Sequence, residues 1–318
     1  MAKKTLIYFV SDLHGSSLCF RKFINAARVY KPTVLVLGGD LAGKAIQSIV
    51  RGPGGIWECN FVGTPYKVQD GPELVELERL IADHGYYPYR AEPGELEAME
   101  AEGTLDALFL RLMRERLTDW LNLADERLRP LELPLYMMLG NDDPVELGEL
   151  VDRAPWGVHA EGKVVWIDDQ HEMISWGYAN TTPWHTFREQ DEQQLAAVYK
   201  SMADQLQNPE RAVFNLHAPP FGTQLDEAPA LDVNLRVQAS LGQVQYAAVG
   251  STAVREIELE RKPLLGLHGH IHEASGIRRL GERKTVVLNP GSDYTTGALM
   301  GALITLDRDK ASAQLVRG

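Results

Sequence analysis

The sequence predicts an α/β fold whose sheets are mostly parallel, and two observations lead to this prediction. Short apolar runs alternate with helical patterns along the chain, which is typical of βα units. Five of these runs also end in an Asp, Asn or His side chain. Because the carboxyl ends of neighbouring strands in open α/β folds converge on one crevice, the second pattern indicates a site at the edge of a sheet.

The predicted strands are short, buried apolar runs. In chain order, the clearest are residues 6–10, 34–37, 135–139, 211–216 and 264–267. The segments 163–168 and 173–176 predict a hairpin-like pair. Closing antiparallel strands are expected at 284–288 and 298–306.

The stretch from about 43 to 130 interrupts this rhythm. It opens with a Gly/Pro-rich segment at 51–55, and its second half is a long pattern of Glu, Leu, Ala and Arg that only Gly103 breaks. We interpret it as a mostly helical insertion that forms a lid or a dimer contact, although a solvated helical hairpin explains the pattern equally well. The chain length of 318 residues then favours one domain, 1–318, that carries this insertion.

Composition and charge narrow the function classes. The formal net charge of −12 argues against an extended nucleic-acid partner, whereas a small anionic substrate remains compatible because bound metal ions reverse the local field. The two cysteines, Cys19 and Cys59, do not make a disulfide framework, so we expect reduced thiols and a cytoplasmic location. The apolar start is too short for a signal peptide, and no run reaches the roughly 18 residues of a membrane span.

The residues at the strand ends have the chemistry of metal ligands. In chain order they are Asp12, His14, Asp40, Asn141, His217, His270 and His272. Their mixture of carboxylate, imidazole and amide oxygen suits manganese, iron or zinc better than a thiolate site or a calcium site. A glycine precedes Asp40, Asn141 and His270, which predicts a close backbone approach at each turn.

The spacing of these residues predicts two neighbouring ions. The pairs Asp12-x-His14 and His270-x-His272 each place two side chains on one side of an extended segment. The two residues of each pair can therefore bind different ions, and a carboxylate such as Asp40 can bridge the two ions. Two ions about 3.5–4 Å apart clamp a phosphoryl group and lower the pKa of a bridging water.

The ordered set Asp-x-His, Gly-Asp, Gly-Asn, His and Gly-His-x-His resembles the calcineurin-like metallophosphoesterase superfamily. The resemblance spans nearly the whole chain outside the insertion. It implies a four-layer sandwich of two mixed β-sheets flanked by helices. It also implies a small phosphate-ester substrate, two divalent ions (Mn, Fe, Zn or Mg, with manganese favoured) and attack by a metal-bridging hydroxide.

The resemblance also implies how the ligands divide. One ion would be held by Asp12, His14, Asp40 and His272, and the second by Asp40, Asn141, His217 and His270. Further segments are similar to a prokaryotic branch with a Gly-Asn-Asp-Asp motif, namely 180–184, 217–222, 250–251 and 288–292.

One position departs from the family pattern. The superfamily usually has a histidine directly after the Asn, and this chain has Asp142 there. Because a carboxylate near divalent cations has a lowered pKa, Asp142 would be a poor general acid at neutral pH. We therefore expect better turnover of aryl phosphodiesters than of alkyl monoesters. Two alternatives stay open: Asp142 binds a metal, or His185 replaces the missing histidine.

The leading hypothesis is hydrolysis of phosphodiester, or phosphomonoester, bonds. The alternative is a binding or scaffold module that keeps the fold with little or no catalysis; Asp142 and the insertion favour it. The apparently complete ligand set favours the enzyme, and the acidic charge disfavours a nuclease.

Other polar residues have weaker interpretations. His84, His159 and His171 are expected at the surface, and His268 is expected to support the site or the core. Gly250 and Ser251 precede a helical pattern and form either a phosphate site or an ordinary N-cap. The turn 289–292 either supports the site or simply ends a strand, and the acidic segment 189–194 predicts an exposed first helical turn.

Overall fold

The computed structural model describes residues 4–318, and two six-stranded sheets form its centre. The first sheet has the order β22-β21-β1-β2-β7-β8 and contains β1 (Thr5–Val10), β2 (Val34–Gly38), β7 (Leu135–Met138), β8 (Val158–His159), β21 (Met300–Asp307) and β22 (Lys310–Arg317). The second has the order β19-β20-β18-β13-β10-β9 and contains β9 (Val164–Trp166), β10 (Glu172–Trp176), β13 (Val213–Leu216), β18 (Leu265–Leu267), β19 (Gly276–Leu280) and β20 (Thr285–Asn289).

Both sheets are parallel at the centre and antiparallel at the edges. In the first sheet β1, β2, β7 and β8 run parallel, and in the second β10, β13, β18 and β20 do. The hairpin-like pair is confirmed, because β9 and β10 pair antiparallel.

Both predicted closing strands form and have antiparallel neighbours, but they join different sheets. Strand β20 pairs antiparallel with β19 in the second sheet, whereas β21 pairs antiparallel with β1 and β22 in the first. The chain changes sheets between them. Both strands are buried apolar runs, and such a pattern does not say which sheet a strand joins.

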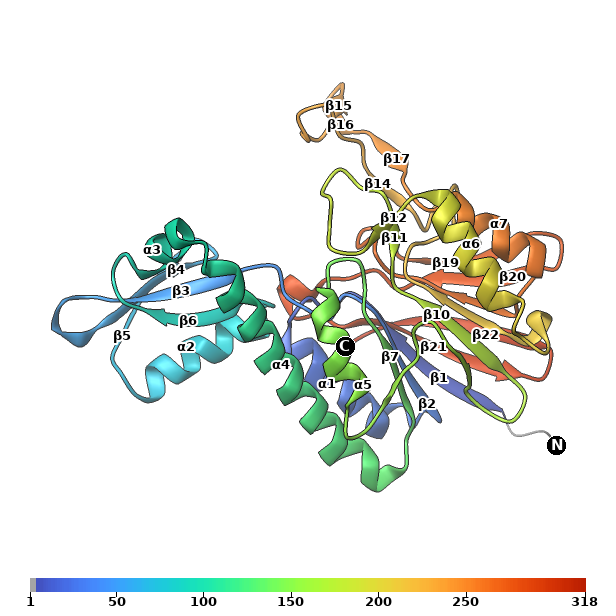
Figure 1. Ribbon diagram of the computed structural model, residues 1–318, viewed down its shortest axis with the longest axis horizontal. Helices are drawn as coiled ribbons and strands as arrows, with labels where there is room; N and C mark the ends of the chain where they lie inside the picture. Colours follow the sequence, from blue (N-terminus) through green and yellow to red (C-terminus); the bar gives the residue numbers. More distant parts are fainter. Residues whose placement is uncertain (1–3) are drawn as a thin grey trace.

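Alternation along the strands builds four layers, which confirms the predicted fold class (Figure 1). Ile7 and Phe9 of β1 pack between the sheets, while Tyr8 and Val10 face the helices on the outer side. The first sheet is covered by α1 (Ser17–Val29), α4 (Leu105–Leu128) and α5 (Gly148–Asp152). The second is covered by α6 (Glu192–Ala203) and α7 (Thr252–Arg261).

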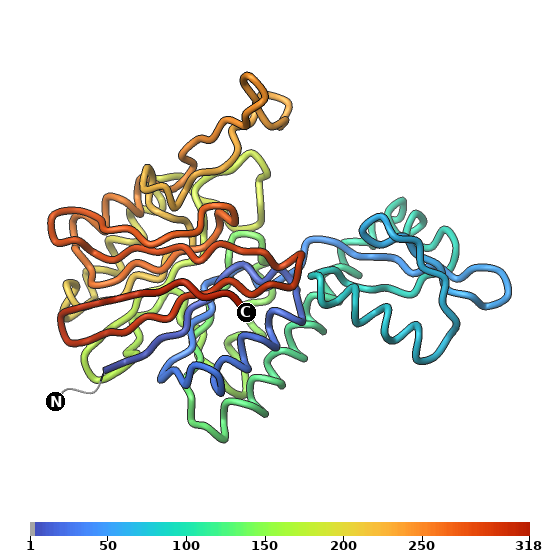
Figure 2. Tube along the Cα trace, turned by 180° about the vertical axis from the view of Figure 1, so that it is seen from behind, coloured from blue at the N-terminus to red at the C-terminus, as the bar shows by residue number. Residues whose placement is uncertain are grey.

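The insertion projects from one end of the sandwich (Figures 1 and 2). It contains a four-stranded sheet of order β5-β4-β3-β6, made by β3 (Ile46–Arg51), β4 (Trp57–Phe61), β5 (Thr64–Val68) and β6 (Tyr87–Ala91). The helices α2 (Pro72–Asp83) and α3 (Glu95–Glu102) complete it, and a small core forms around Ile49, Phe61 and Leu77. The expectation of a mostly helical insertion missed this sheet, because its strands are short and half-exposed and show little apolar periodicity.

Helix α4 connects the insertion to the body. The ring of Trp120 in α4 stacks on Phe20 of α1, with centroids 4.4 Å apart and planes 5° from parallel. Arg116 donates to the carbonyl of Gly15 at 2.6 Å. None of the helices within residues 4–318 combines the length and hydropathy that crossing a bilayer requires.

A second projection is the hairpin arm, which we define as residues 227–249. It consists of β14 (Glu227–Pro229) paired with β17 (Tyr246–Ala248), and a tip of β15 (Ala239–Ser240) paired with β16 (Gln243–Val244). Beside its base lies the short parallel pair of β11 (Ala179–Asn180) and β12 (Glu189–Gln190). The arm stands off the sandwich above the loops that follow the central strands (Figure 1).

Candidate metal centre

The loops after the central strands bring the expected ligands of both sheets together. The loops after β1, β2 and β7 supply Asp12, His14, Asp40 and Asn141, and those after β13 and β18 supply His217, His270 and His272. Asp12, His14, Asp40, Asn141 and His217 are all at most 3% exposed. These charged and polar groups therefore meet between the sheets with little access to water.

Two groups of these side chains have the spacing of metal sites. One is Asp12, His14, Asp40 and His272, and the other is Asp40, His217 and His270; within each, one ligand atom per residue lies within 4.8 Å of the others. Asp40 belongs to both groups. The family resemblance implies the same two sets with Asn141 added to the second.

Asp40 lies between two imidazoles. Its Oδ2 is 3.5 Å from Nε2 of His14 and 3.3 Å from Nε2 of His217. His14 Nε2 is also 2.9 Å from His272 Nε2. At this distance, at most one of the two Nε2 atoms can carry a proton. If neither is protonated, both lone pairs can point at one cation between the rings.

Buried atoms without hydrogen-bond partners show that the site fits metal ions. The Nδ2 group of Asn141 donates to Thr186 Oγ1 at 3.0 Å, which leaves its Oδ1 buried and without a partner. His217 Nδ1 donates to the carbonyl of Gly38 at 2.9 Å, so its free Nε2 is an unprotonated acceptor in the neutral ring. Since an unpaired buried polar atom costs about 1–3 kcal/mol, a bound cation explains why both face inward.

The protonation of several groups also suits metal binding. Burial raises the pKa of Asp12, but the hydrogen bond of His272 and the charge of His217 lower it to about 2. Burial lowers the pKa of His14 to about 3 and that of His270 to about 4. Near neutral pH these residues are thus a carboxylate and two neutral imidazoles, the forms that bind divalent ions. His217 differs: burial lowers its pKa, but Asp40 raises it to about 9, so a metal ion must displace the proton on its Nε2 near neutral pH.

Four of the candidate ligands have a left-handed backbone. The φ angles of Asp12, His14, Asp40 and His270 are 58°, 41°, 52° and 68°. Such conformations cost of order 1–3 kcal/mol each in non-glycine residues and persist where the surroundings impose them. Here, backbone hydrogen bonds join the loops, including Asp12 N to Gly39 O at 3.0 Å and His14 N to Asp40 O at 2.9 Å.

The expected close approaches occur at the glycines of the site. A Cβ at Gly140 would lie 2.0 Å from Asp40 Oδ1, and one at Gly269 would lie 2.3 Å from Asp12 Oδ2. Both distances are far below a van der Waals contact. Each glycine therefore lets a carboxylate from another loop reach the centre.

The carboxylate of Asp143 supports the centre in a way that the sequence does not reveal. It accepts hydrogen bonds from the backbone of Leu41 at 2.9 Å, Ala42 at 2.7 Å and Gly140 at 2.7 Å. Burial and the charge of Asp40 raise its pKa to about 7. Asp143 thus joins the loop of Asp40 to the loop of Asn141, but in the sequence nothing distinguishes it from Asp142.

Lys44 is a second residue that the sequence does not single out. Its Nζ lies 2.6 Å from Oδ2 of Asp142, and both side chains line the cavity at the metal centre. Burial lowers the pKa of Lys44, but the charge and hydrogen bond of Asp142 raise it overall. The pKa of Asp142 is also raised overall, because burial and the charge of Asp40 raise it more than Lys44 lowers it, in contrast to the lowered pKa that was expected next to cations. The place of the usual histidine is therefore occupied by an ion pair.

The turn 289–292 supports the site. Asn289 Nδ2 donates to the carbonyls of Gly269 at 3.2 Å and Ile271 at 2.8 Å, which fixes the loop that contains His270. Ser292 Oγ donates to the carbonyl of Asp12 at 2.6 Å. His268 is fully buried, and its Nδ1 bonds to the carbonyl of Leu216 at 2.7 Å, so it lies in the core behind the ligands, as expected.

The segment 250–251 is a helix cap rather than a phosphate site. Ser251 is the N-cap of α7 and accepts from Val254 N at 3.2 Å. The carboxylate of Glu192 already accepts from Thr252 N at 3.1 Å and Ala253 N at 2.8 Å. Asp191 is the N-cap of α6, and Glu192 is the first residue of the helix. The helix therefore begins in the middle of the acidic segment 189–194, whereas residues 189 and 190 belong to β12.

The remaining histidines differ from their expected places. His185 is exposed and is not among the residues that line the cavity, so the structure does not bring it to the metal centre. The expectation of a surface position was wrong for His171, which is 1% exposed and bonds Asp168 at 2.7 Å. His159 contacts Asp152 at 2.9 Å, and the half-buried His84 packs edge-on against Phe61. Asp168 lies only three residues before His171, so this contact is local, and the burial of His171 is what the sequence pattern did not reveal.

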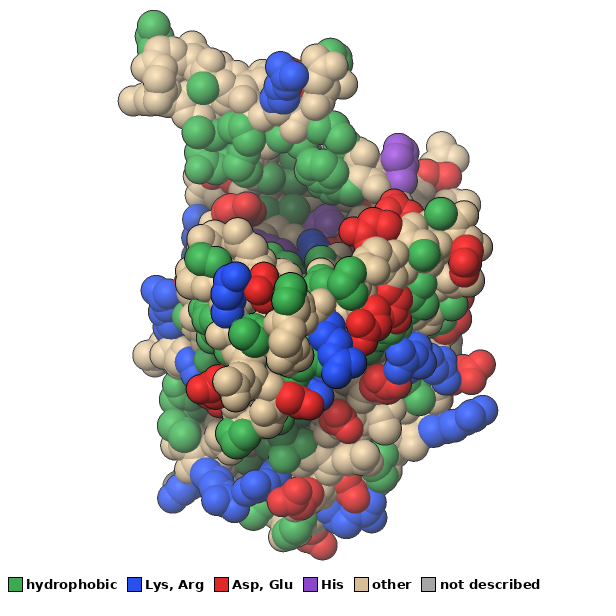
Figure 3. Space-filling view, turned by 90° about the vertical axis from the view of Figure 1, so that its left-hand side faces the viewer, with side chains coloured by type: hydrophobic (Ala, Val, Ile, Leu, Met, Phe, Trp, Pro, Cys, Tyr) green, Lys and Arg blue, Asp and Glu red, His purple; other side chains and the backbone are tan. Residues whose placement is uncertain are grey.

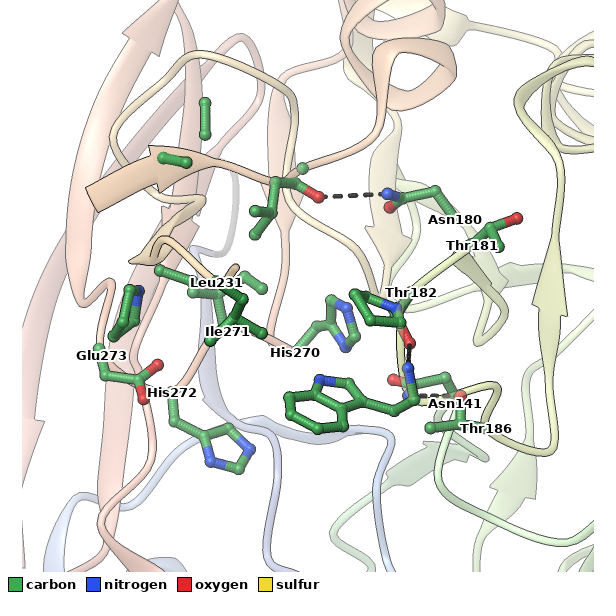
Figure 4. Close-up of a pocket in the computed structure, with 18 of the residues that line it drawn as sticks. Asn141, Asn180, Thr181, Thr182, Thr186, Leu231, His270, Ile271, His272 and Glu273 are labelled. Carbon is green, nitrogen blue, oxygen red and sulfur yellow. Dashed lines mark hydrogen bonds between the residues drawn. The ribbon is translucent and has the colours of Figure 1, made fainter. Parts of the chain in front are cut away.

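The metal centre opens into a large cavity of about 1130 Å³. Figure 4 shows His270 between Leu231 and Ile271 on one side and Asn141 and Thr186 on the other. In the space-filling view, histidines lie at the floor of a hollow beneath an apolar overhang (Figure 3). The site is therefore open to a ligand much larger than a phosphate ion.

The structure is an α/β two-sheet sandwich with two clusters of candidate metal ligands that share Asp40, and the sandwich is the fold that the calcineurin-like resemblance implies. Among solved structures, TT1561 of Thermus thermophilus is similar, with 13% identity, a TM-score of 0.53 and coverage of 98% of this chain and 99% of that one. A further crystal structure matches with 14% identity, a TM-score of 0.56 and the same coverage of both chains. At such identities the likeness establishes a shared fold. No family model and no curated protein matches the sequence.

Proposed function

We propose that this protein is a metal-dependent phosphoesterase that uses two divalent ions, with manganese favoured, and cleaves phosphodiester bonds in preference to monoesters. One observation supports this most directly: Asp40 is shared by two ligand groups, beside the unpartnered Oδ1 of Asn141 and Nε2 of His217. When bound, two such ions supply a nucleophile at neutral pH and a clamp for the phosphoryl oxygens.

The protein's own groups have separate roles in this proposal. Asp12, His14 and His272 would hold one ion, Asn141, His217 and His270 would hold the other, and Asp40 would be shared by both. The backbone N–H groups of His270 and Asp142 donate to Asp12 and Asp40 at 2.9 Å each and keep these carboxylates oriented.

The ion pair of Lys44 and Asp142 stands where the usual histidine would act. Lys44 is a fixed cation that lines the cavity, so we propose that it stabilises negative charge on the leaving oxygen without giving up its proton. This favours esters whose leaving group needs little protonation, such as aryl phosphodiesters. His185 is not proposed for this role because it does not line the cavity.

The test begins with protein stripped of metal. Hydrolysis of bis-p-nitrophenyl phosphate and p-nitrophenyl phosphate is measured with Mn²⁺, Mg²⁺, Zn²⁺ or no metal, and bound metal is measured by mass spectrometry. We expect diester cleavage that requires metal and about two ions per chain.

Two variants make the test specific. Asp40→Asn removes the shared carboxylate and should lower activity at least about a hundredfold, with a loss of bound metal. Asp152→Asn is the matched control, because it changes an Asp that pairs with His159 outside the centre. A protein that binds no metal, or that turns over equally with and without it, would refute the proposal.

A further inference from the structure

The cavity at the metal centre has two walls of opposite character. One wall holds the candidate ligands with Lys44 and Asp142, and the other is the inner side of the hairpin arm. Figure 3 shows this arm as an apolar overhang above the hollow. Its cavity-lining side chains include Leu231, Leu235, Val237 and Val249.

The arm is unusually poor in charge for an exposed segment. Only Glu227, Asp232 and Arg236 are charged among its 23 residues, whereas 24% of the whole chain is charged. Val237 is 53% exposed and Leu235 43% exposed, although both line the cavity. Phe221 and Trp184, 41% and 60% exposed, extend the apolar lining beyond the arm. This wall leaves apolar area in water that a ligand could cover.

Several polar groups around this wall are already bonded within the protein. Asn180 Nδ2 donates to the carbonyl of Val249 at 3.1 Å, and Thr182 Oγ1 donates to Glu189 at 2.6 Å. In the arm, Ala230 N donates to Gln245 O at 2.8 Å. The wall therefore offers aliphatic contact and few free donors, which suits a hydrocarbon chain better than the hydrogen-bonding edge of a nucleobase.

We propose that the substrate is a phosphate ester that carries an aliphatic hydrocarbon chain, with the phosphoryl group at the metal centre and the chain along the hairpin arm. This inference rests on the proposed function, because the metal centre must hold the phosphoryl group. The volume of about 1130 Å³ leaves room for such a chain beside the phosphoryl group. Val237, Val249 and Leu231 would lose exposed apolar surface when the chain binds.

The experiment uses the manganese-loaded enzyme and a series of p-nitrophenyl alkyl phosphates with methyl, butyl, octyl and dodecyl chains. The leaving group is constant, so kcat/KM reports the contribution of the chain. Burial of one methylene corresponds to about a fourfold gain at most. We expect kcat/KM to rise at least about tenfold from methyl to octyl.

A matched pair of variants locates the effect on the arm. Val237→Glu places a charge on the cavity wall and should reduce the octyl-to-methyl ratio of kcat/KM at least about fivefold. Val244→Glu makes the same change at a residue that is 45% exposed, lies in the same hairpin and does not line the cavity. It should leave the ratio unchanged.

A binding measurement separates failure of this inference from failure of the proposed function. Calorimetric titration with methylphosphonate and dodecylphosphonate reports chain binding without turnover. If no ester is cleaved, the proposed function is wrong, and tighter binding of dodecylphosphonate still supports the apolar site. Equal turnover and equal binding across the chain lengths would overturn the inference.

The same substrates identify the source of the chain. Cleavage of the dodecyl ester below its critical micelle concentration supports a free amphiphile as the substrate. Cleavage only when the ester is embedded in phosphatidylcholine vesicles supports a membrane lipid.

Discussion

At the scale of single residues, Gly140 shows how closely the loops of the metal centre approach each other. The backbone N–H of Gly140 donates to Asp143, and its Cα faces the carboxylate of Asp40. A methyl group here would force the shared carboxylate of Asp40 out of its position in the centre. The same loop places Asn141 Oδ1 toward the centre.

Gly140→Ala should therefore lose metal and activity while the fold remains. The added Cβ would lie 2.0 Å from Asp40 Oδ1, so Asp40 must move. We expect metal affinity to fall by about 10–100-fold, as when the support of a ligand is removed. Gly148→Ala is the control, because it has helical angles and its Cβ would meet nothing closer than 3.8 Å. Equal metal content in both variants would show that the close approach is unimportant.

Lys44 allows a second test at this scale. If it stabilises the leaving oxygen, Lys44→Gln should slow an alkyl ester about 10–100-fold and a p-nitrophenyl ester only a few-fold, because p-nitrophenolate needs less stabilisation. Lys67→Gln is the matched control, since this lysine pairs with Glu58 at 3.0 Å in the insertion. The idea fails if the two esters slow equally, or if Lys67→Gln has the same effect.

At the scale of elements, the N-terminus of α7 shows why the Gly-Ser segment before it is not a ligand site. Ser251 Oγ donates to Glu192 at 2.7 Å, and the same carboxylate accepts two backbone N–H groups of α7. A carboxylate at this end of a helix is stabilised by the helix dipole. Glu192 thus joins α6 to α7 on the outer face of the second sheet.

Glu192→Ala should destabilise the protein by about 1–2 kcal/mol, because it leaves two N–H groups of α7 without their partner. The change is measured as the free energy of unfolding in urea. Gln193→Ala is the control, because this neighbouring side chain is exposed and makes no α7 contact of this kind. A difference between the variants below about 0.5 kcal/mol would mean that water replaces the carboxylate at no cost.

At the scale of the whole molecule, the metal centre lies where the two sheets meet. Three loops of the first sheet and two of the second supply its ligands. Without cations, Asn141 Oδ1 and His217 Nε2 are buried polar atoms that lack hydrogen-bond partners. Bound ions should therefore tie the sheets together.

Removal of both ions should lower the melting temperature by about 8 °C, or about 4 °C for each ion. Ions at a hundred times their dissociation constant stabilise the folded state by about 2.7 kcal/mol per site. The measurement is calorimetry with Mn²⁺ or with EDTA. In Asp40→Asn the two conditions should give the same melting temperature. If EDTA leaves the melting temperature of the unsubstituted protein unchanged, the centre is stable without cations.

The sequence by itself determined most strands of the two sheets, although not β8, β19 and β22, and it determined the set of candidate ligands. Buried strands such as 6–10 and 34–37 are short apolar runs, and Asp12 or Asp40 follows each closely, so both features are local. The ordered motifs resemble the calcineurin-like superfamily, and that resemblance implied the sandwich.

Only the tertiary structure decided the contacts between distant segments. The ion pair of Lys44 with Asp142, the joining of two loops by Asp143 and the burial of His171 depend on which loops meet. The sequence did not predict the sheet of the insertion or the apolar wall of the hairpin arm, for a related reason. Their strands are short and exposed, and their partners lie far along the chain, so periodicity alone cannot identify them.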